Sequence, residues 1–122
     1  MENIFEIVTI KSLSDNYVWL VRNNVKNLTA VIDPSDDKDV NEVLLLKNWH
    51  LNQIVNTHHH FDHTNGNLKL KNKWKAELIG PEEEKDKIKN IKTYVSDGDK
   101  TEIAGLDALV VHTPGHTLGH VM

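Results

Sequence analysis

The chain has 122 residues, with 14 basic and 18 acidic side chains, a formal net charge of −4 and no cysteine. This length holds one domain, and the acidic balance argues against a broad basic surface for nucleic acid. Without cysteine the chain has no disulfide or thiolate metal site, and because it shows neither a membrane-spanning run nor a signal peptide we expect a cytoplasmic protein.

The first third of the chain is predicted to form an antiparallel β-meander. Residues 3–11 and 17–22 are rich in β-branched and apolar side chains, with a polar turn between them. An asparagine turn then leads to a third apolar run at residues 28–32, which ends at Asp33 and Pro34. These runs predict neighbouring strands.

A helix is predicted next, from a cap at Ser35 or Asp36 to about Asn48. Acidic residues near its start and a lysine near its end suit the helix dipole. The apolar side chains at helical spacing are Val40, Val43 and Leu44. We expect these to face inward and His50, just past the helix, to lie on the surface.

A second helix is predicted at residues 66–75, with Leu68 and Trp74 as poor apolar anchors and its lysines in solvent. Residues 76–80 read as a short strand, and the charged residues 82–89 as a surface helix or loop.

Further along, residues 101–104 and 106–112 predict a hairpin around Gly105. The second strand of this hairpin would deliver the chain to a Thr-Pro-Gly-His sequence that begins at Thr113.

The strongest functional signal is the first histidine segment, residues 57–63, which reads Thr-His-His-His-Phe-Asp-His. It follows the mostly apolar run 53–56, which predicts a buried strand. The segment should therefore lie where a strand ends in a loop, the place where α/β folds bind ligands. The alternative is a solvated histidine-rich loop with incidental metal affinity.

The spacing of this segment suits a metal centre. Side chains alternate faces in an extended chain, so His58, His60 and Asp62 project together. If the backbone turns after Phe61, Asp62 and His63 can serve a second ion beside the first. Nitrogen and carboxylate ligands without thiolates suit zinc, iron(II) or manganese.

The second histidine segment, residues 112–120, carries His112, His116 and His120 at intervals of four. Its Pro-Gly pair excludes a continuous helix, so His116 should lie in a tight loop at a strand end. We expect His116 to be the third imidazole of the first ion. His112 is expected to pack or form a hydrogen bond, and His120 to orient a neighbouring ligand.

The motif His-x-His-x-Asp-His is similar to the signature of the metallo-β-lactamase fold. With Asp-Asn-Tyr at 15–17, Val-Ile-Asp-Pro at 31–34 and Thr-Pro-Gly-His-Thr-Leu-Gly-His at 113–120, the chain resembles the glyoxalase II (hydroxyacylglutathione hydrolase) branch of that superfamily. The resemblance implies an α/β fold, the αββα sandwich, with only its N-terminal sheet-plus-helices half present. Residues 1–122 would then be the first part of a single domain, truncated before its second half.

The resemblance also implies the ligand set. His58, His60 and His116 would bind the first metal and Asp62 and His63 the second, with Asp62 also the catalytic residue. Family members add a bridging aspartate and a further histidine, which we expect beyond the end of this chain. The implied cofactor is a pair of Zn²⁺ ions, with iron or manganese as alternatives.

The implied activity is hydrolysis of a glutathione thioester, S-D-lactoylglutathione, to D-lactate and glutathione by metal-activated hydroxide, as in methylglyoxal detoxification. No nucleic acid or membrane partner is expected. One alternative is another enzyme of the same fold, such as a persulfide dioxygenase or a lactonase. Another is a non-catalytic metal-binding remnant, because the distal ligands are missing.

Half a sandwich also predicts a sheet face with incomplete cover. The strand residues concerned are Ile7, Val18, Leu20, Val31, Ile54, Leu109 and Val111. We expect some of them to be open to water, and the chain to self-associate through that face.

Overall fold

The computed structural model describes residues 4–12, 16–58, 64, 66–113, 119, 121 and 122. The described residues form a six-stranded sheet and a separate two-stranded sheet. The strands are β1 (Phe5–Ser12), β2 (Asn16–Asn23), β3 (Leu28–Ile32), β4 (Gln53–Val55), β5 (Glu77–Pro81), β6 (Thr93–Val95), β7 (Lys100–Ile103) and β8 (Leu106–Leu109). The helices are α1 (Asp37–Lys47), α3 (Asn67–Trp74) and the 3₁₀ turn η1 (Glu82–Glu84).

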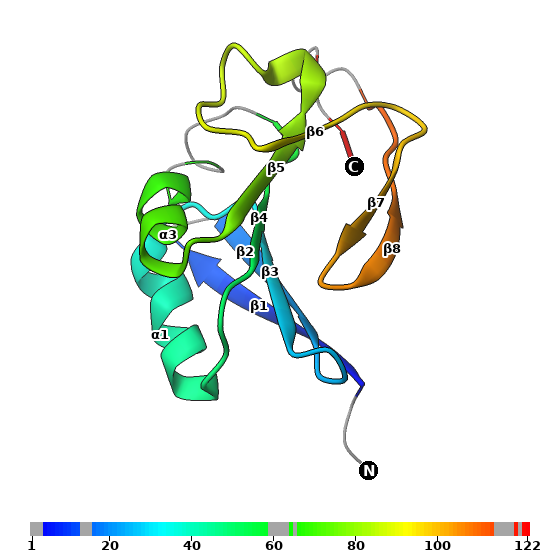
Figure 1. The fold of residues 1–122 in the computed structure, drawn as a ribbon. Coiled ribbons are helices and arrows are strands. Elements are labelled where there is room, and N and C mark those ends of the chain that lie inside the picture. Colours follow the sequence, from blue (N-terminus) through cyan, green and yellow to red (C-terminus); the bar gives the residue numbers. More distant parts are fainter. Residues whose placement is uncertain (1–3, 13–15, 59–63, 65, 114–118, 120) are drawn as a thin grey trace.

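The large sheet has its strands in chain order, β1 to β6. β1, β2 and β3 pair antiparallel, which confirms the predicted meander, whereas β3 to β6 pair parallel. Each parallel strand is added on the same side of the previous one, so right-handed crossovers place their helices on one face. Figure 1 shows α1 and α3 together on that face. The carboxyl ends of β3, β4 and β5 therefore meet at one edge of the sheet.

The main hydrophobic core lies between this face and the helices. Its fully buried side chains include Val18, Leu20, Val31, Ile54, Val40, Leu44 and Leu70. α1 presents Val40 and Leu44 as predicted, with Val43 partly buried beside them. Asp36 occupies the predicted N-cap position, but its side chain forms no capping hydrogen bond.

The predicted anchors of α3 are half wrong. Leu68 is 56% exposed, whereas Leu70 is fully buried. Trp74 is partly buried, and its indole N–H donates to Asn41 Oδ1 of α1 at 2.8 Å. Positions 67, 70 and 74 share one face of a helix, and it is this face that meets the sheet.

Residues 82–89 form a largely exposed turn and loop, as their charges predicted, but two of their side chains are buried. Glu84 is fully buried and Ile88 is 4% exposed. Ile91 packs so close to Gly80 that a Cβ there would lie 2.7 Å from Ile91 Cδ1. Residues 82–91 cover the part of the sheet beyond α3, with Ile88 and Ile91 turned toward the core. The chain then continues into β6, a strand of three residues that the sequence pattern did not predict.

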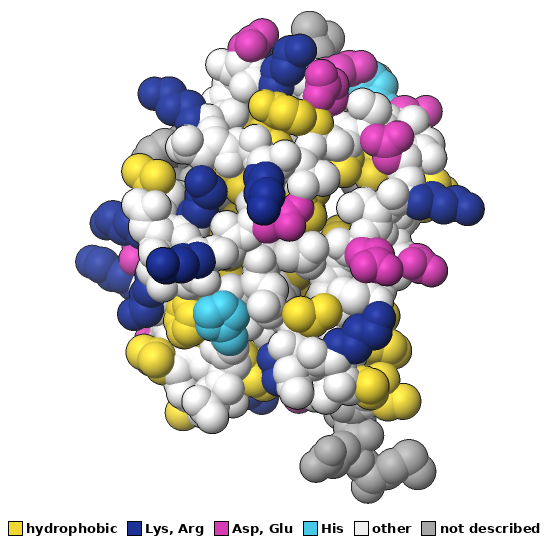
Figure 2. All heavy atoms as spheres, viewed as in Figure 1, with side chains coloured by type: hydrophobic (Ala, Val, Ile, Leu, Met, Phe, Trp, Pro, Cys, Tyr) yellow, Lys and Arg dark blue, Asp and Glu magenta, His cyan; other side chains and the backbone are white. Residues whose placement is uncertain are grey.

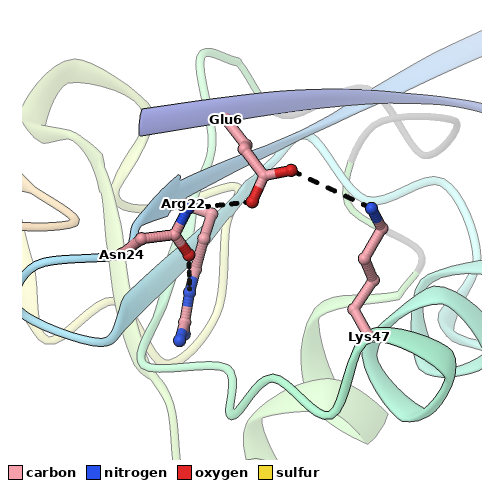
Figure 3. Close-up of polar contacts among 4 residues, drawn as sticks. All are labelled: Glu6, Arg22, Asn24 and Lys47. Atoms are coloured by element: carbon pink, nitrogen blue, oxygen red, sulfur yellow. Dashed lines mark hydrogen bonds and ion pairs between the residues drawn. The ribbon is translucent and has the colours of Figure 1, made fainter. Parts of the chain in front are cut away.

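A buried arginine, Arg22 of β2, is hydrogen-bonded to β3 and to the turn between β2 and β3. Arg22 is 8% exposed and donates to Thr29 Oγ1 at 2.9 Å and to Asn24 Oδ1 at 3.2 Å. Asn24 donates in turn to Glu6 Oε2 at 2.9 Å, and Glu6 lies 4.0 Å from the Lys47 ammonium of α1 (Figure 3). These contacts tie β1, the β2–β3 turn and α1 together, far along the strands from the histidine segments.

The other face of the sheet is covered only in part. The β7–β8 hairpin lies on this side (Figure 1), and its Ala104 and Glu102 backbone groups bond the side-chain amide of Gln53. A second core of Val55, Ile79, Val95, Val110 and Val121 forms beneath it. Over β1 and β2 the same face is open, with Ile7 68% and Trp19 44% exposed.

The expectation that some strand residues stay open to water is confirmed. Ile7 and Leu109 are more than half exposed, whereas Val18, Leu20, Val31 and Ile54 are completely buried. The buried ones all point toward the helices, and the exposed ones point away from them or lie on the hairpin. The predicted hairpin is confirmed as well, with its turn at Ala104 and Gly105, both at positive φ.

Figure 2 shows lysine and arginine side chains gathered over the helical side of the molecule. Helices α1 and α3, which lie on that side, each contain lysines. In the part of the chain that the structure describes, no helix has the length and apolar character needed to cross a membrane. The cytoplasmic location and the absence of a nucleic-acid partner stay predictions.

Candidate metal centre

The described residues of the candidate site follow the ends of two neighbouring parallel strands. β3 ends at Ile32 and is followed by Asp33, and β4 ends at Val55 and is followed by Asn56 and Thr57. The Asp33 N–H donates to Val55 O at 2.8 Å, so the two segments stay hydrogen-bonded where strand β3 ends. Because these strands run parallel, their following loops lie side by side at one edge of the sheet.

Thr57 connects Asp33 to His58. The Thr57 backbone N–H donates to Asp33 Oδ1 at 2.8 Å, and the Thr57 hydroxyl donates to Asp33 Oδ2 at 2.6 Å. The same hydroxyl lies 2.8 Å from His58 Nδ1. His58 is 3% exposed and Asp33 is 8% exposed, so the three side chains form a largely buried polar chain.

The residues that flank the first histidine segment are fastened to the fold. Asn56, before the segment, and Asn67, after it, exchange amide hydrogen bonds, with Asn56 Nδ2 donating to Asn67 Oδ1 at 3.1 Å. Gly66 N–H donates to Pro34 O at 2.9 Å. A Cβ on Gly66 would lie 3.0 to 3.2 Å from backbone atoms of residues 34–37, so only glycine fits this approach without a shift.

The second histidine segment is joined to the first. His112 and Val121 form an isolated antiparallel bridge, and the Val121 N–H donates to Thr57 O at 3.0 Å. Outside the bridge, His112 Nε2 lies 3.3 Å from Glu83 Oε2, and a Cβ on Gly119 would collide with the Glu83–Glu84 backbone and side chains. The His112 side chain therefore lies at ion-pair distance from a carboxylate, and its expected role in packing or a hydrogen bond stays a prediction. Thr57, the residue next to His58, binds the far end of the segment that carries His116.

The predicted ligands divide into one residue that the structure describes and four that it does not. His58 lies at the end of β4, as expected. His60, Asp62, His63 and His116 lie outside the described residues, so their arrangement stays a prediction. Among the residues that are described, no three histidine or carboxylate side chains gather as a metal site. His50 is exposed, as predicted, and stacks edge-on against Trp74.

Sequence reasoning missed the residues that support the site. The sequence pattern places Asp33 at the end of a strand and in the Val-Ile-Asp-Pro motif, and it gives Asn56 and Asn67 no role at the site. These residues do not belong to a short motif, because each is hydrogen-bonded to a residue that is distant in sequence. The available signal was topological: the ends of neighbouring parallel strands meet, so Asp33 after one strand should lie beside Thr57 after the next.

The amide pair gives a test of how the first histidine segment is anchored. Replacing Asn67 by alanine removes the amide that faces Asn56, a residue with no exposed surface. We expect the free energy of unfolding to fall by about 1–3 kcal/mol, because a buried polar group loses a partner. Urea denaturation measures this loss.

The matched control is Asn72→Ala, an exposed asparagine on the same helix. A surface substitution of this kind should change stability by no more than about 0.5 kcal/mol. Equal losses in the two variants would show that the amide pair does not anchor the segment.

The described part of the site fits a zinc-type ion. His58 is a buried imidazole at a strand end, and its Nδ1 is occupied by the Thr57 hydroxyl. Metal-binding histidines ordinarily use one ring nitrogen for the metal and the other for such a hydrogen bond. The sequence around it offers only imidazole and carboxylate donors, since the chain has no cysteine.

The fold and the described part of the site define a class, the α/β proteins that carry histidines at the strand ends of a half-covered sheet. The chain belongs to the Metallo-beta-lactamase superfamily, whose sequence pattern it matches over residues 13–122. The fold class implied by the early resemblance is therefore confirmed. The sheet with helices α1 and α3 corresponds to half of the αββα sandwich.

The curated relatives narrow the resemblance further. The chain is 47% identical over 116 residues to a protein named hydroxyacylglutathione hydrolase from Pelagibacter ubique, covering 95% of this chain and 48% of that protein. It is 41% identical to the protein of the same name from Rhodospirillum rubrum, covering 95% of this chain and 45% of that protein. The chain thus spans about half the length of these relatives. The resemblance to the glyoxalase II branch is confirmed.

Solved structures agree on the fold. The crystal structure of ETHE1 from Myxococcus xanthus matches with a TM-score of 0.77 and 25% identity, covering 98% of this chain and 52% of that one. A metallo-beta-lactamase from Staphylococcus aureus matches with a TM-score of 0.81 and 22% identity, covering 98% and 36%. The BLEG-1 B3 metallo-beta-lactamase matches with a TM-score of 0.80 and 19% identity, covering 96% and 65%. The last two likenesses concern the fold alone.

Proposed function

We propose that this chain is the N-terminal part of a single-domain, metal-dependent hydrolase of glutathione thioesters. The observation that carries the proposal is the 47% identity to a hydroxyacylglutathione hydrolase across 95% of the chain. The proposed substrate is S-D-lactoylglutathione, which yields D-lactate and glutathione. The two histidine segments, both intact in the sequence, support the same assignment.

The proposed ligands of the first zinc ion are His58, His60 and His116. Asp62 and His63 are proposed for the second ion, with Asp62 also the catalytic residue. The Val121–Thr57 hydrogen bond supports this pairing, because it fastens the end of the second histidine segment beside the start of the first. When bound, such metal ions lower the pKa of a coordinated water and polarise the carbonyl under attack.

The described residues have their own part in this chemistry. Thr57 and Asp33 hold His58 in one orientation, and the Asn56–Asn67 pair joins the residues that flank the first histidine segment. Such rigid support matters because misplacement of reacting groups by about 1 Å can cost roughly 100-fold in rate. The leaving thiol has an ordinary pKa of about 8.5, so its thiolate departs without a strong general acid.

The test is hydrolysis of S-D-lactoylglutathione by the purified 122-residue chain and by the Pelagibacter relative of full length. We expect measurable turnover by the chain, but roughly 100-fold or more below the relative, since groups that position substrate and hydroxide are not all present in these residues. His58→Ala should abolish the residual turnover, which controls for a contaminating hydrolase.

Two outcomes would contradict the proposal. The first is no metal-dependent thioester hydrolysis above that of His58→Ala. The second is hydrolysis of a lactone, or oxidation of a persulfide, in the absence of thioester hydrolysis, which would favour the alternative enzymes of this fold. Turnover equal to that of the relative would leave the reaction standing and show that the rest of the relative adds little to catalysis.

A further inference from the structure

Asp33, Thr57 and His58 form a directional chain of hydrogen bonds. Thr57 brings both of its donors to the Asp33 carboxylate, the backbone N–H to one oxygen at 2.8 Å and the hydroxyl to the other at 2.6 Å. His58 Nδ1 lies 2.8 Å from that same hydroxyl oxygen. All three residues come from the strand ends that form the candidate site.

A count of protons shows which group donates in each of these hydrogen bonds. An ionised carboxylate can only accept hydrogen bonds, and a hydroxyl has one proton to donate. Because the Thr57 hydroxyl uses its proton toward Asp33 Oδ2, it must act as acceptor toward His58. A neutral His58 then carries its proton on Nδ1 and has its lone pair on Nε2.

We propose that Asp33 is a positioning residue that sets the tautomer of His58 through the Thr57 hydroxyl, so that Nε2 is presented to a metal ion. The tautomer itself belongs to the metal-free chain. Only its consequence for metal binding rests on the proposed function. Neither Asp33 nor Thr57 need touch the ion or the substrate for this role.

The backbone at Asp33 supports this assignment. Its φ is 51°, in the left-handed region, although the residue precedes Pro34. A residue before proline ordinarily adopts an extended conformation, so this one is doubly uncommon. Strained backbone persists where the surroundings hold it and is concentrated at functional sites. At Asp33 the strain aims a carboxylate at both donors of Thr57.

Asp33→Asn makes the proposal testable, because an amide has one acceptor and one donor side. The Thr57 backbone N–H cannot turn round, so the amide oxygen must face it and the amide NH₂ must face the hydroxyl. The hydroxyl then turns its own proton toward Nδ1. The asparagine variant should therefore reverse the tautomer of His58 to the Nε2–H form.

Two substitutions at Thr57 complete the set. Thr57→Ser keeps the hydroxyl and should keep the wild-type tautomer. Thr57→Val keeps the shape but removes the hydroxyl, so it should remove the preference for Nδ1–H. This second variant tests the proposal even if Asp33→Asn does not fold.

The experiment is long-range ¹H–¹⁵N correlation spectroscopy of the metal-free 122-residue chain, labelled with ¹⁵N-histidine, at a pH where imidazoles are neutral. His58→Ala assigns the His58 signals by their loss. We expect Nδ1–H in the wild type and Thr57→Ser, and Nε2–H in Asp33→Asn. An Nε2–H wild type, or a tautomer unchanged in both Asp33→Asn and Thr57→Val, overturns the proposal.

Zinc titration of the same samples separates this inference from the proposed function. Asp33→Asn and Thr57→Val should weaken zinc binding by about 10- to 100-fold, the usual effect of losing a hydrogen-bond partner of a metal ligand. Thr57→Ser should bind zinc as the wild type does. If the tautomers are as predicted but no zinc binds, the metal centre is refuted and the role of Asp33 in setting the tautomer stands. If zinc binds but the tautomer is wrong, only the role of Asp33 is refuted.

Discussion

A variant in which His58, His60 and His116 are all replaced by alanine is expected to lose most of its bound zinc. These three imidazoles are the proposed donors of the first ion, whereas the second ion is offered only Asp62 and His63. A site with three neutral nitrogen donors should bind more firmly than one with two ligands, so the wild type should retain about one zinc ion per chain. Elemental analysis of dialysed protein measures the content.

The control for this experiment is His50→Ala. His50 is exposed and contacts Trp74 edge-on, so its removal should leave the zinc content unchanged. Circular dichroism must show that each variant is folded, because His58 is buried and alanine leaves a small cavity there. Equal zinc content in the wild type and the folded triple variant would dispose of the ligand assignment.

The second large effect concerns association through the open sheet face. Ile7 and Trp19 lie on the side of β1 and β2 away from the helices, 68% and 44% exposed, with Phe5 and Tyr17 about half exposed beside them. Apolar patches of a few hundred Å² mark interaction surfaces or aggregation sites. We therefore expect the isolated chain to self-associate and to bind a hydrophobic dye.

Ile7→Thr combined with Trp19→Thr should shift the chain toward monomer and reduce dye binding, as measured by sedimentation velocity and fluorescence. Threonine is chosen because its branched side chain suits a strand, so the fold should be kept. The matched control is Leu46→Thr, which removes a leucine that is 83% exposed on the helical side, and it should not alter association. A wild-type monomer with a sharp melt and no dye binding would show that these residues close their own core.

Local patterns were sufficient for most of the elements. The alternation of apolar residues in β1 and β2 and the helical spacing of Val40 and Leu44 reflect burial on one face, which a sequence displays directly. The hairpin was predictable because its turn needs a residue at positive φ, and Gly105 supplies one. The failures came where burial contradicts the polarity of the side chain: Leu68 is apolar and exposed, whereas Glu84 is polar and buried.

The same division holds at the candidate site. The sequence by itself determined the superfamily and the chemistry on offer, because the spacing of His58, His60 and Asp62 is a local property of the chain. Only the tertiary structure decided what supports that chemistry. Parallel pairing of β3 and β4 sets Asp33 against Thr57 across 24 positions, and the Val121–Thr57 bond joins segments still further apart. Such contacts depend on which strand ends meet, and the pairing of the strands decides this rather than any local pattern of residues.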